Sequence, residues 1–271
     1  MYVKCNLCGQ DNYKVIWRDA GKQIVKCRSC GLMYFNPRTE HEKYDFTYYE
    51  TAAEGGYIQA YDHRLDWIRL NKLQKIKRYG KLLDVGCAFG FFLEKARARG
   101  YETMGVEVSK EASQYAVEKL GLKVINAPFD KAAALPLDYF DIITLWHVIE
   151  HLDNPFETLV LLKKYLKKDG ILVIEVPNEF NSLFMRLRRI KFTKREPVTP
   201  PPKHLYWFTP KTLASIVTKS GYHILKIETE ELANTRFWEK RFYIKWAKPF
   251  LDSIAQKLNM GYLIRVYAER R

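Results

Sequence analysis

The chain contains no run of about 20 apolar residues, the length that a helix needs to cross a membrane. Its N-terminus, with Cys5 and Cys8 among the first residues, also lacks the build of a secretory signal peptide. These two absences predict a cytoplasmic protein. With 271 residues, 47% of them hydrophobic, the chain is long enough for one large α/β domain and a small appendage.

Acidic residues are scarce, and the shortage is uneven along the chain. There are 31 Asp and Glu against 45 Lys and Arg, a formal net charge of +14. Residues 181–271 alone hold 19 Lys and Arg against 7 Asp and Glu. A basic surface attracts phosphate groups, but its sign does not distinguish nucleic acid, anionic lipid and nucleotide-linked sugar, and it equally serves solubility.

Cysteine is also rare, yet four of the five cysteines form two Cys-x-x-Cys pairs, each followed by glycine. The pairs are Cys5 with Cys8 and Cys27 with Cys30, with 18 residues between Cys8 and Cys27. This spacing is typical of a zinc ribbon, in which four thiolates bind one Zn²⁺. Because all four ligands are protein thiolates, we expect a closed, structural zinc site. Two disulfides are the alternative, which a reducing cytoplasm disfavours.

The segment from Lys81 to Gly90 joins an apolar strand to a glycine-bearing turn and then to a helix. Gly86 and Gly90 can take backbone angles, or allow a ligand approach, that a Cβ would obstruct. The turn departs from the G-x-G-x-x-G of dinucleotide-binding folds. The next strand ends in Glu107, whose carboxylate can accept two hydrogen bonds from a ribose diol. Together these features predict an adenosyl ligand.

Strands and helices then alternate, which predicts a parallel sheet. A third strand ends near Asn126, and a fourth, over 140–145, runs into Trp146. A fifth, over 171–176, is apolar enough to be buried on both faces, and further strands are expected over 223–228 and 262–268. Helices are expected over 91–99, 110–120, 155–166 and 210–220, with N-caps at Ser109, at Asp153 or Asn154, and at Thr209.

Ligands of open α/β sheets lie beyond the carboxyl ends of the strands. Asp84 would organise the glycine turn or meet the ligand's amino group through water, and Cys87 would offer only its backbone. The full set of expected cofactor contacts is Asp84, Gly86, Cys87, Gly90, Glu107, Val108, Asn126, Ala127, Trp146 and His147.

The order and spacing of these motifs resemble the class I S-adenosylmethionine-dependent methyltransferases, in the branch with D-V-G-C-x-x-G, an acidic second-strand end and E-H-L after strand four. The resemblance covers residues 81–271. It implies S-adenosylmethionine as cofactor and a Rossmann-like seven-stranded sheet with six parallel strands and an antiparallel last strand. The chain is also similar to sugar and glycan methyltransferases of the methyltransferase-23 type that begin with a zinc ribbon.

Three parts are predicted: a zinc ribbon over 1–35, a linker and helical cover over 36–80, and a methyltransferase domain over 81–271 with insertions at 178–209 and 232–260. In the resembling family the cover lies over the methyl-donor pocket. The tyrosines Tyr48, Tyr49 and Tyr61 could therefore line the acceptor site, although packing explains them equally well. The segments 180–192 and 237–258 mix aromatic with basic residues, so they could contact a membrane surface or simply cap the substrate side.

Methyl transfer to a hydroxyl needs alignment of donor and acceptor and removal of a proton. The resemblance places His204 over the acceptor site, beside Lys203 and Tyr206, and makes it the expected base. Related sugar C-methyltransferases carry Glu before this histidine and a further C-terminal domain, whereas here Lys203 precedes it. This departure favours an oxygen acceptor.

His147, Glu150 and His151 would share one helical face with i, i+3 and i+4 spacing if their segment is helical. They could assist His204, bind a divalent metal with it, or be structural. The metal alternative comes from a likeness to small-RNA 2′-O-methyltransferases with E-x-x-E-H and a distant His, in which His147 replaces the first Glu. Three histidines and one carboxylate suit Zn²⁺ or Fe²⁺ better than Mg²⁺.

The leading hypothesis is methyl transfer from S-adenosylmethionine to a hydroxyl of a sugar, glycan or glycolipid precursor, which a nucleotide or lipid could carry. We expect the enzyme in the cytoplasm, with peripheral contact at the inner membrane face as an option. RNA methylation through the basic last third and a non-catalytic zinc-ribbon scaffold are the alternatives. A nicotinamide-dependent sugar-nucleotide enzyme would need a G-x-G-x-x-G turn and a Tyr-x-x-x-Lys pair, and neither stands in a suitable place.

Overall fold

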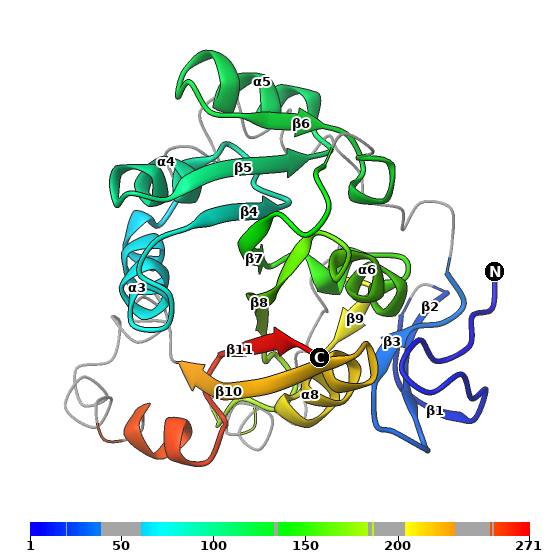
Figure 1. The fold of residues 1–271 in the computed structure, drawn as a ribbon. Helices are drawn as coiled ribbons and strands as arrows, with labels where there is room; N and C mark the ends of the chain where they lie inside the picture. Colours follow the sequence, from blue (N-terminus) through cyan, green and yellow to red (C-terminus); the bar gives the residue numbers. More distant parts are fainter. Residues whose placement is uncertain are drawn as a thin grey trace.

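A computed structural model describes residues 1–19, 21–38, 61–132, 135–183, 186, 204–230, 250 and 252–271 (Figure 1). Most of the two segments considered for membrane contact, 180–192 and 237–258, lies outside the described residues. Among the residues described, no helix has both the length and the apolar character that crossing a bilayer requires.

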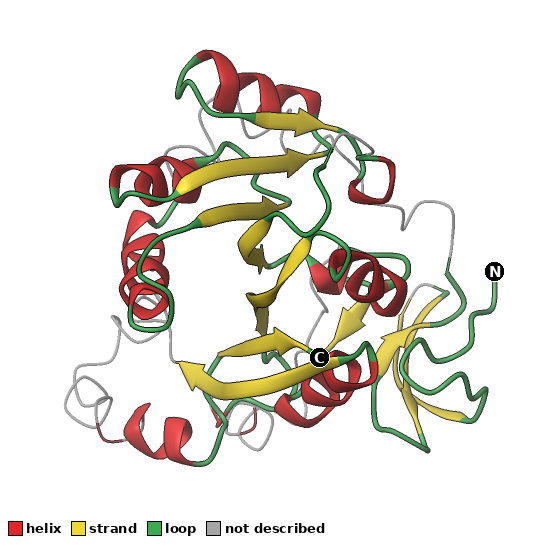
Figure 2. Ribbon diagram, in the orientation of Figure 1, coloured by secondary structure: helices red, strands yellow, loops and turns green. Residues whose placement is uncertain are grey.

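A seven-stranded sheet runs through the centre of the protein, with strand order β10-β11-β8-β7-β4-β5-β6 (Figures 1 and 2). The strands from β6 to β8 pair in parallel, and β11 is antiparallel to both β8 and β10. The predicted Rossmann-like methyltransferase sheet, with six strands in one direction and the last one reversed, is confirmed. Its strands are β4 (Lys81–Val85), β5 (Glu102–Glu107), β6 (Val124–Asn126), β7 (Phe140–Trp146), β8 (Leu166–Pro177), β10 (Tyr222–Glu230) and β11 (Leu263–Arg270).

Helices cover both faces of this sheet. Successive residues of a strand point to opposite faces, so they pack against different helices. Leu82 packs in a cluster with residues of α3 (His63–Gln74) and α4 (Phe91–Ala98). Leu83, the next residue, packs in the cluster that contains α6 (Pro155–Leu162) and α8 (Pro210–Lys219). Helix α5 (Lys110–Glu118) contacts β5 and β6.

The predicted helix starts are confirmed by their caps. Ser109 accepts a hydrogen bond from the Ala112 N–H, and Asn154, rather than Asp153, caps α6. Thr209 forms a capping box with Thr212. The helices end one to four residues earlier than predicted. The largest difference is at α6, because the chain turns after Lys163 and begins β8 at Leu166.

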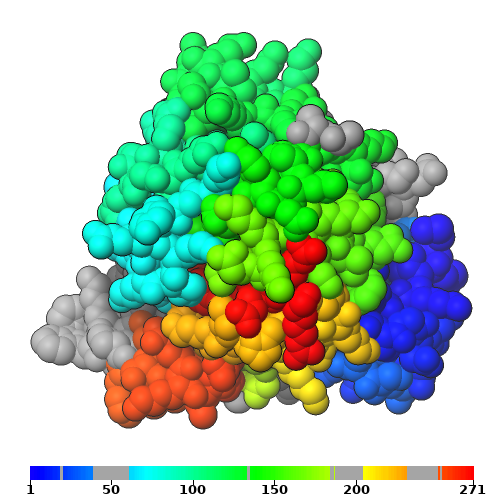
Figure 3. Space-filling model, viewed as in Figure 1, coloured from blue at the N-terminus to red at the C-terminus, as the bar shows by residue number. Residues whose placement is uncertain are grey.

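The N-terminal ribbon forms a second sheet of four antiparallel strands, ordered β1-β2-β3-β9. Three strands come from the ribbon, and the fourth, β9 (Tyr206–Trp207), comes from the segment that follows His204. The space-filling view shows the ribbon in blue at one edge of the molecule, against the segments that carry α6 and α8 (Figure 3). The predicted domain boundary at residue 35 therefore separates β1, β2 and β3 from β9, which belongs to the same sheet. The ribbon strands are β1 (Tyr13–Asp19), β2 (Lys22–Cys27) and β3 (Met33–Phe35).

Crowding at Gly90 leads to a stability prediction. Gly90 has a φ of +79°, and an added Cβ would lie 2.5 Å from Leu122 Cδ1 and 3.0 Å from Ala116 Cβ. Gly121 has a φ of +61° but only Arg97 Nη1, at 3.9 Å, near its Cβ position. We expect Gly90→Ala to lower the free energy of unfolding by about 2 to 4 kcal/mol and Gly121→Ala by about 1 kcal/mol.

Urea denaturation followed by circular dichroism measures both values. Since both substitutions carry the left-handed penalty, their difference isolates the steric clash at Gly90. Equal losses in the two variants would contradict the packing we describe.

Candidate active site

A cavity of about 1060 Å³ lies at the carboxyl ends of β4, β5 and β7. Helix α3 contributes to its wall through Leu65 and Arg69, after Tyr61 and Asp62. We call two further parts of the wall the glycine-turn side and the histidine side. The glycine-turn side consists of Asp84–Phe89, Glu107, Val108, Ala127–Asp130 and Trp146. The histidine side consists of His151–Asn154, Glu157, Thr158, Leu161 and His204.

The glycine turn is tightly packed. Gly86 has a φ of +72° and donates a hydrogen bond to the Val106 carbonyl, and an added Cβ would lie 2.6 Å from Val148 Cγ2. Gly90 does not line the cavity, and its missing Cβ makes room for Leu122. Of the two glycines, Gly86 is the one that lines the cavity, and Gly90 shapes the turn.

Glu107 is fixed at the end of β5. One carboxylate oxygen accepts a hydrogen bond of 2.8 Å from the Ala88 N–H, and the other accepts one of 2.8 Å from the Ser109 N–H. Burial raises the pKa of Glu107, and these backbone donors oppose that effect. Since each carboxylate oxygen has a second lone pair, the side chain can accept two further hydrogen bonds from a diol in the cavity.

Three other expected cofactor contacts differ in what they do. Asp84 lines the cavity, accepts a hydrogen bond of 2.7 Å from Thr144, and has its pKa raised to about 7 by burial. The sulfur of Cys87 lies against Gly105, where an added Cβ would be only 2.5 Å away, so the thiol is a packing group. Asn126 does not line the cavity; its amide donates to the carbonyls of Glu107 and Val108 and holds the turn after β5.

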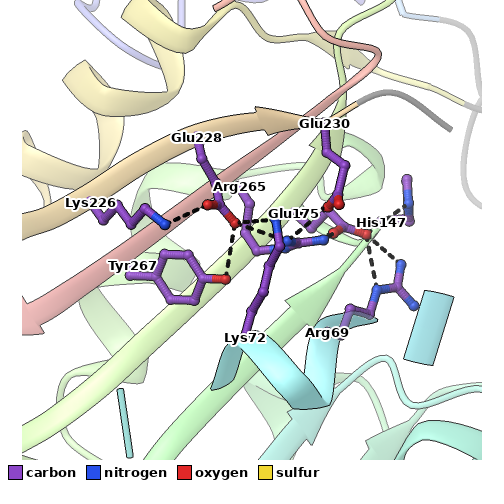
Figure 4. A network of polar contacts seen from close by, with 9 residues as sticks. All are labelled: Arg69, Lys72, His147, Glu175, Lys226, Glu228, Glu230, Arg265 and Tyr267. Carbon is purple, nitrogen blue, oxygen red and sulfur yellow. Dashed lines mark hydrogen bonds and ion pairs between the residues drawn. The ribbon is translucent and has the colours of Figure 1, made fainter. Parts of the chain in front are cut away.

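A buried charge network connects the cavity wall to the sheet (Figure 4). Glu175, at the end of β8, accepts hydrogen bonds from Arg69 Nε at 3.0 Å and Arg265 Nε at 2.8 Å. Burial raises the pKa of Glu175, but the two guanidinium groups outweigh it and hold the pKa well below its usual range. Arg69 also lies over the ring of Trp146, 4.7 Å from the centroid. The network therefore fixes a cation at the cavity wall.

The network extends to the edge of the sheet. Arg265 Nη1 contacts Glu228 at 3.0 Å and Glu230 at 3.1 Å, and Lys72 of α3 contacts the same two carboxylates. Helix α3 is thus tied to β8, β10 and β11. The sequence analysis did not identify Arg69 or Glu175 as site residues. A carboxylate inside a strand that is buried on both faces was the available signal, because such a charge needs a partner.

His147 does not share a helical face with Glu150 and His151. Its φ is +57°, and only Ile149–His151 form a short 3₁₀ turn, η3. Its ring lies between two carboxylates, with Nδ1 3.5 Å from Glu150 Oε1 and Nε2 3.4 Å from Glu175 Oε1. Burial lowers the pKa of His147, but the two carboxylates outweigh it and raise the pKa to about 9. At neutral pH His147 is a cation, which makes it a poor proton acceptor.

His204 lies at the histidine side of the cavity with a carboxylate behind it. Its Nδ1 is 3.1 Å from Glu179 Oε2, and its ring centroid is 4.7 Å from that of His151. Burial lowers the pKa of His204, but Glu179 outweighs it, so the pKa is raised. Glu179 was missed in the sequence, because nothing in a linear pattern pairs residues 25 positions apart.

Glu150 is almost completely buried beside these histidines. Neither carboxylate oxygen makes a hydrogen bond with the described residues. Burial raises the pKa of Glu150, but His147, His151 and His204 outweigh it, so the pKa is lowered. Glu150, His151 and His204 offer ligand atoms within 4.8 Å of one another. Two nitrogens and one oxygen could hold a divalent metal, and His147 is not part of this group.

The four ribbon cysteines gather at one point. Their sulfurs all lie within 4.8 Å of one another, with 3.4 Å between Cys5 and Cys30 and 3.5 Å between Cys8 and Cys27. All four are free thiols. Zn–S bonds of about 2.3 Å in a tetrahedron place sulfurs about 3.8 Å apart. The cluster therefore fits one Zn²⁺ and not two disulfides.

The expected substrate-binding residues differ in whether they line the cavity. Tyr61 lines the cavity, and its hydroxyl donates to Asp66. Tyr206 does not line the cavity; its buried hydroxyl contacts Arg38 and the Asp153 carbonyl. Tyr206 therefore supports the wall from behind. Tyr48, Tyr49 and Lys203 lie outside the described residues.

Comparison with known proteins identifies the family. The profile of a methyltransferase-domain family of the methyltransferase-23 type matches residues 57–227. A ubiquinone biosynthesis O-methyltransferase from Actinobacillus pleuropneumoniae is 29% identical over 136 residues, which cover 45% of this chain and 58% of that protein. A second, from Aromatoleum aromaticum, is 32% identical over 40% of this chain and 47% of that protein. The chain thus spans about half the length of these relatives.

Solved structures share the fold. The match to a SAM-dependent methyltransferase from Archaeoglobus fulgidus has a TM-score of 0.55 and 24% identity, and covers 83% of this chain and all of that chain. A possible histamine N-methyltransferase from Thermotoga maritima gives a TM-score of 0.58 and 17% identity, over 86% of this chain and all of that chain. Since the family profile covers more than half of the chain, from the cover helix to β10, the protein belongs to this family of methyltransferases.

Proposed function

We propose that the protein transfers a methyl group from S-adenosylmethionine to a hydroxyl of a sugar, glycan or glycolipid precursor, with His204 as the general base. One observation carries the proposal. His204, held by Glu179, faces the same cavity as Glu107 and the glycine turn.

The glycine-turn side fits the donor. Glu107 would bind the ribose diol, and the segment from Pro128 to Asp130 would border the adenine. Asp84 would face the amino group, and Arg69 the carboxylate, of the methionine part. When bound, S-adenosylmethionine supplies an electrophilic methyl group. The residues on this side hold and orient it, and no proton transfer is required of them.

The histidine side fits the acceptor. During methyl transfer, His204 Nε2 would accept the proton that the acceptor hydroxyl gives up. Glu179 holds the Nδ1–H, so it fixes the tautomer and stabilises the imidazolium that forms. The raised pKa of His204 makes it a stronger base than a free imidazole.

The polar side chains on the histidine side support the choice of a hydroxylated acceptor. Asp153, Asn154, Glu157 and Thr158 offer hydrogen-bonding groups on this side of the cavity. A polyhydroxylated ring could form hydrogen bonds with such groups, whereas a purely apolar acceptor could not. The related proteins named as O-methyltransferases support oxygen as the accepting atom. Turnover of sugar nucleotides but not of simple phenols, followed as S-adenosylhomocysteine release, tests this choice.

We expect the substitution Glu107→Gln to weaken donor binding. The amide presents only one acceptor oxygen to the diol, and loss of a hydrogen bond to a charged group costs about 1.5 to 3 kcal/mol. The Kd for S-adenosylhomocysteine, measured by calorimetry, should rise about 10- to 100-fold. Glu102→Gln, the same change at the exposed start of β5, is the matched control and should leave the Kd unchanged. Equal effects would remove Glu107 from the donor site.

We expect the substitution His204→Gln to lower kcat by about 10²- to 10⁴-fold, because the proton acceptor is lost. Donor affinity should stay within about twofold, since His204 is on the other side of the cavity. The exposed residue His223 of β10 provides the control, His223→Gln. A parallel loss of donor binding would indicate a structural role for His204.

The pH profile gives an independent check on the same base. Only neutral His204 accepts a proton, so kcat/KM should rise with pH through the raised pKa of His204, above the ordinary value of 6.5. The substitution Glu179→Gln removes the carboxylate that raises this pKa. The acidic limb should then move to lower pH, and a limb that stays in place would exclude the His204–Glu179 pair as the titrating group.

For the cysteine cluster we propose one structural zinc ion per chain. If the His204 mechanism is correct, mass spectrometry of the purified protein should find one zinc per chain, and His151→Ala should not change this content. The oxygens of Glu150, which make no hydrogen bond with the described residues, favour one competing possibility, a second metal at Glu150, His151 and His204. Two metal ions per chain, with one lost in His151→Ala, would replace the base mechanism by a metal-assisted one.

A further inference from the structure

We infer that the ribbon positions the histidine side of the cavity, with Asn6 as its main positioning residue. The inference rests on the proposed function only in assigning that side to the acceptor. Three sets of contacts lead from the ribbon to the segments around residues 150–156 and 204–207.

The first contact comes from inside a cysteine knuckle. Asn6 lies between Cys5 and Cys8, and its side chain donates a hydrogen bond of 2.6 Å to Asn154 Oδ1. Its own Oδ1 accepts a hydrogen bond of 2.9 Å from the Phe156 N–H. Asn154 caps α6 and lines the cavity. Two asparagines, one from the ribbon, therefore bind successive N–H groups at the start of α6 and fix the loop that carries His151.

The second contact is strand pairing directly beside His204. Met33 of β3 pairs with Trp207, and Tyr34 pairs with Tyr206. The Phe35 N–H donates to the Leu205 carbonyl at 3.1 Å, while the Leu205 N–H donates to the Glu150 carbonyl at 2.9 Å. The peptide after His204 is thus hydrogen-bonded to the ribbon on one side and to the η3 turn on the other.

The third contact comes from Arg38, which follows the ribbon closely in the chain. Arg38 Nη1 donates to the Asp153 carbonyl at 3.0 Å, and the same guanidinium contacts the Tyr206 hydroxyl. Tyr206 in turn donates to the Asp153 carbonyl at 3.0 Å. These bonds join the loop after β7 to the segment after His204.

The ribbon's own shape depends on its cysteines. Short ribbons cannot bury a sufficient core, so thiolate ligation of a metal supplies their folding free energy. Loss of the metal would release Asn6 and β3, and with them Asn154 and His204. The glycine turn and Glu107 are held instead by β4, β5 and their parallel pairing. We therefore expect the ribbon to control one side of the cavity and not the other.

The substitution Asn6→Ala tests this in the full-length, zinc-loaded protein. It removes two hydrogen bonds, so we expect amide hydrogen exchange in peptides covering 149–157 and 204–208 to rise about fivefold to tenfold. Exchange in 81–108 and the Kd for S-adenosylhomocysteine should stay within about twofold. The control is Asn12→Ala, a substitution at an exposed residue of the ribbon. It keeps the Asn12 carbonyl, which accepts a hydrogen bond from the Arg28 N–H. Zinc content of one per chain verifies that the ribbon is intact.

Metal removal with a chelator gives a second measurement that needs no variant. Faster exchange in 149–157 and 204–208, with donor affinity retained, supports the inference. Unchanged exchange there overturns it, and so does equal loss of protection in 81–108, because the ribbon would then stabilise the whole domain.

Neither measurement requires an acceptor, so a wrong acceptor class would not affect the result. Once an acceptor is known, Asn6→Ala should lower turnover while leaving donor affinity intact.

Discussion

The carboxylate of Glu175 is the group on which the arrangement of the site depends. It is fully buried at the end of β8, an inner strand of the sheet, and two guanidinium groups hold it, one from α3 and one from β11. Removing one partner of such a pair typically costs about 3 to 5 kcal/mol, although the intact pair adds little net stability. The contacts of Glu175 with Arg69 and Arg265 therefore select one arrangement of the surrounding elements rather than add stability. They require α3 to lie over the carboxyl ends of the strands, which gives the cavity its third wall.

Glu175 also makes the surroundings of His147 differ from those of His204, although the two histidines look equivalent in the sequence. His147 lies between Glu175 and Glu150 and stays protonated at neutral pH. Its positive charge partly balances Glu150, whose oxygens make no hydrogen bond with the described residues. His204 is hydrogen-bonded to the carboxylate of Glu179 through the nitrogen opposite the one assigned to the acceptor. One histidine is therefore suited to balance charge and the other to exchange a proton.

Much of the fold could be predicted from local patterns, because short segments of the sequence indicate the alternating strands and helices and their caps. The strands and helices of the methyltransferase domain, the caps at Ser109 and Thr209 and the two cysteine pairs belong to this class. The site contacts do not, since Arg69 and Glu175 are 106 residues apart. The shared face of His147 and Glu150 was expected only if their segment is helical, and that condition is not met for a local reason: His147 has a left-handed backbone, so the helical spacing does not apply. The pairing of β3 with β9 is equally non-local.

Glu179 changes the argument that was drawn from Lys203. Related C-methyltransferases have a glutamate directly before the histidine, and its absence here favoured an oxygen acceptor. The structure supplies a carboxylate to His204 from the segment after β8, 3.1 Å from Nδ1. The chain thus contains a histidine–carboxylate pair without the local motif, and base strength no longer separates a carbon from an oxygen acceptor. The choice of oxygen depends instead on the O-methyltransferase relatives and on the polar side chains around His204. One of them, Asn154 at the start of α6, is held by the ribbon through Asn6.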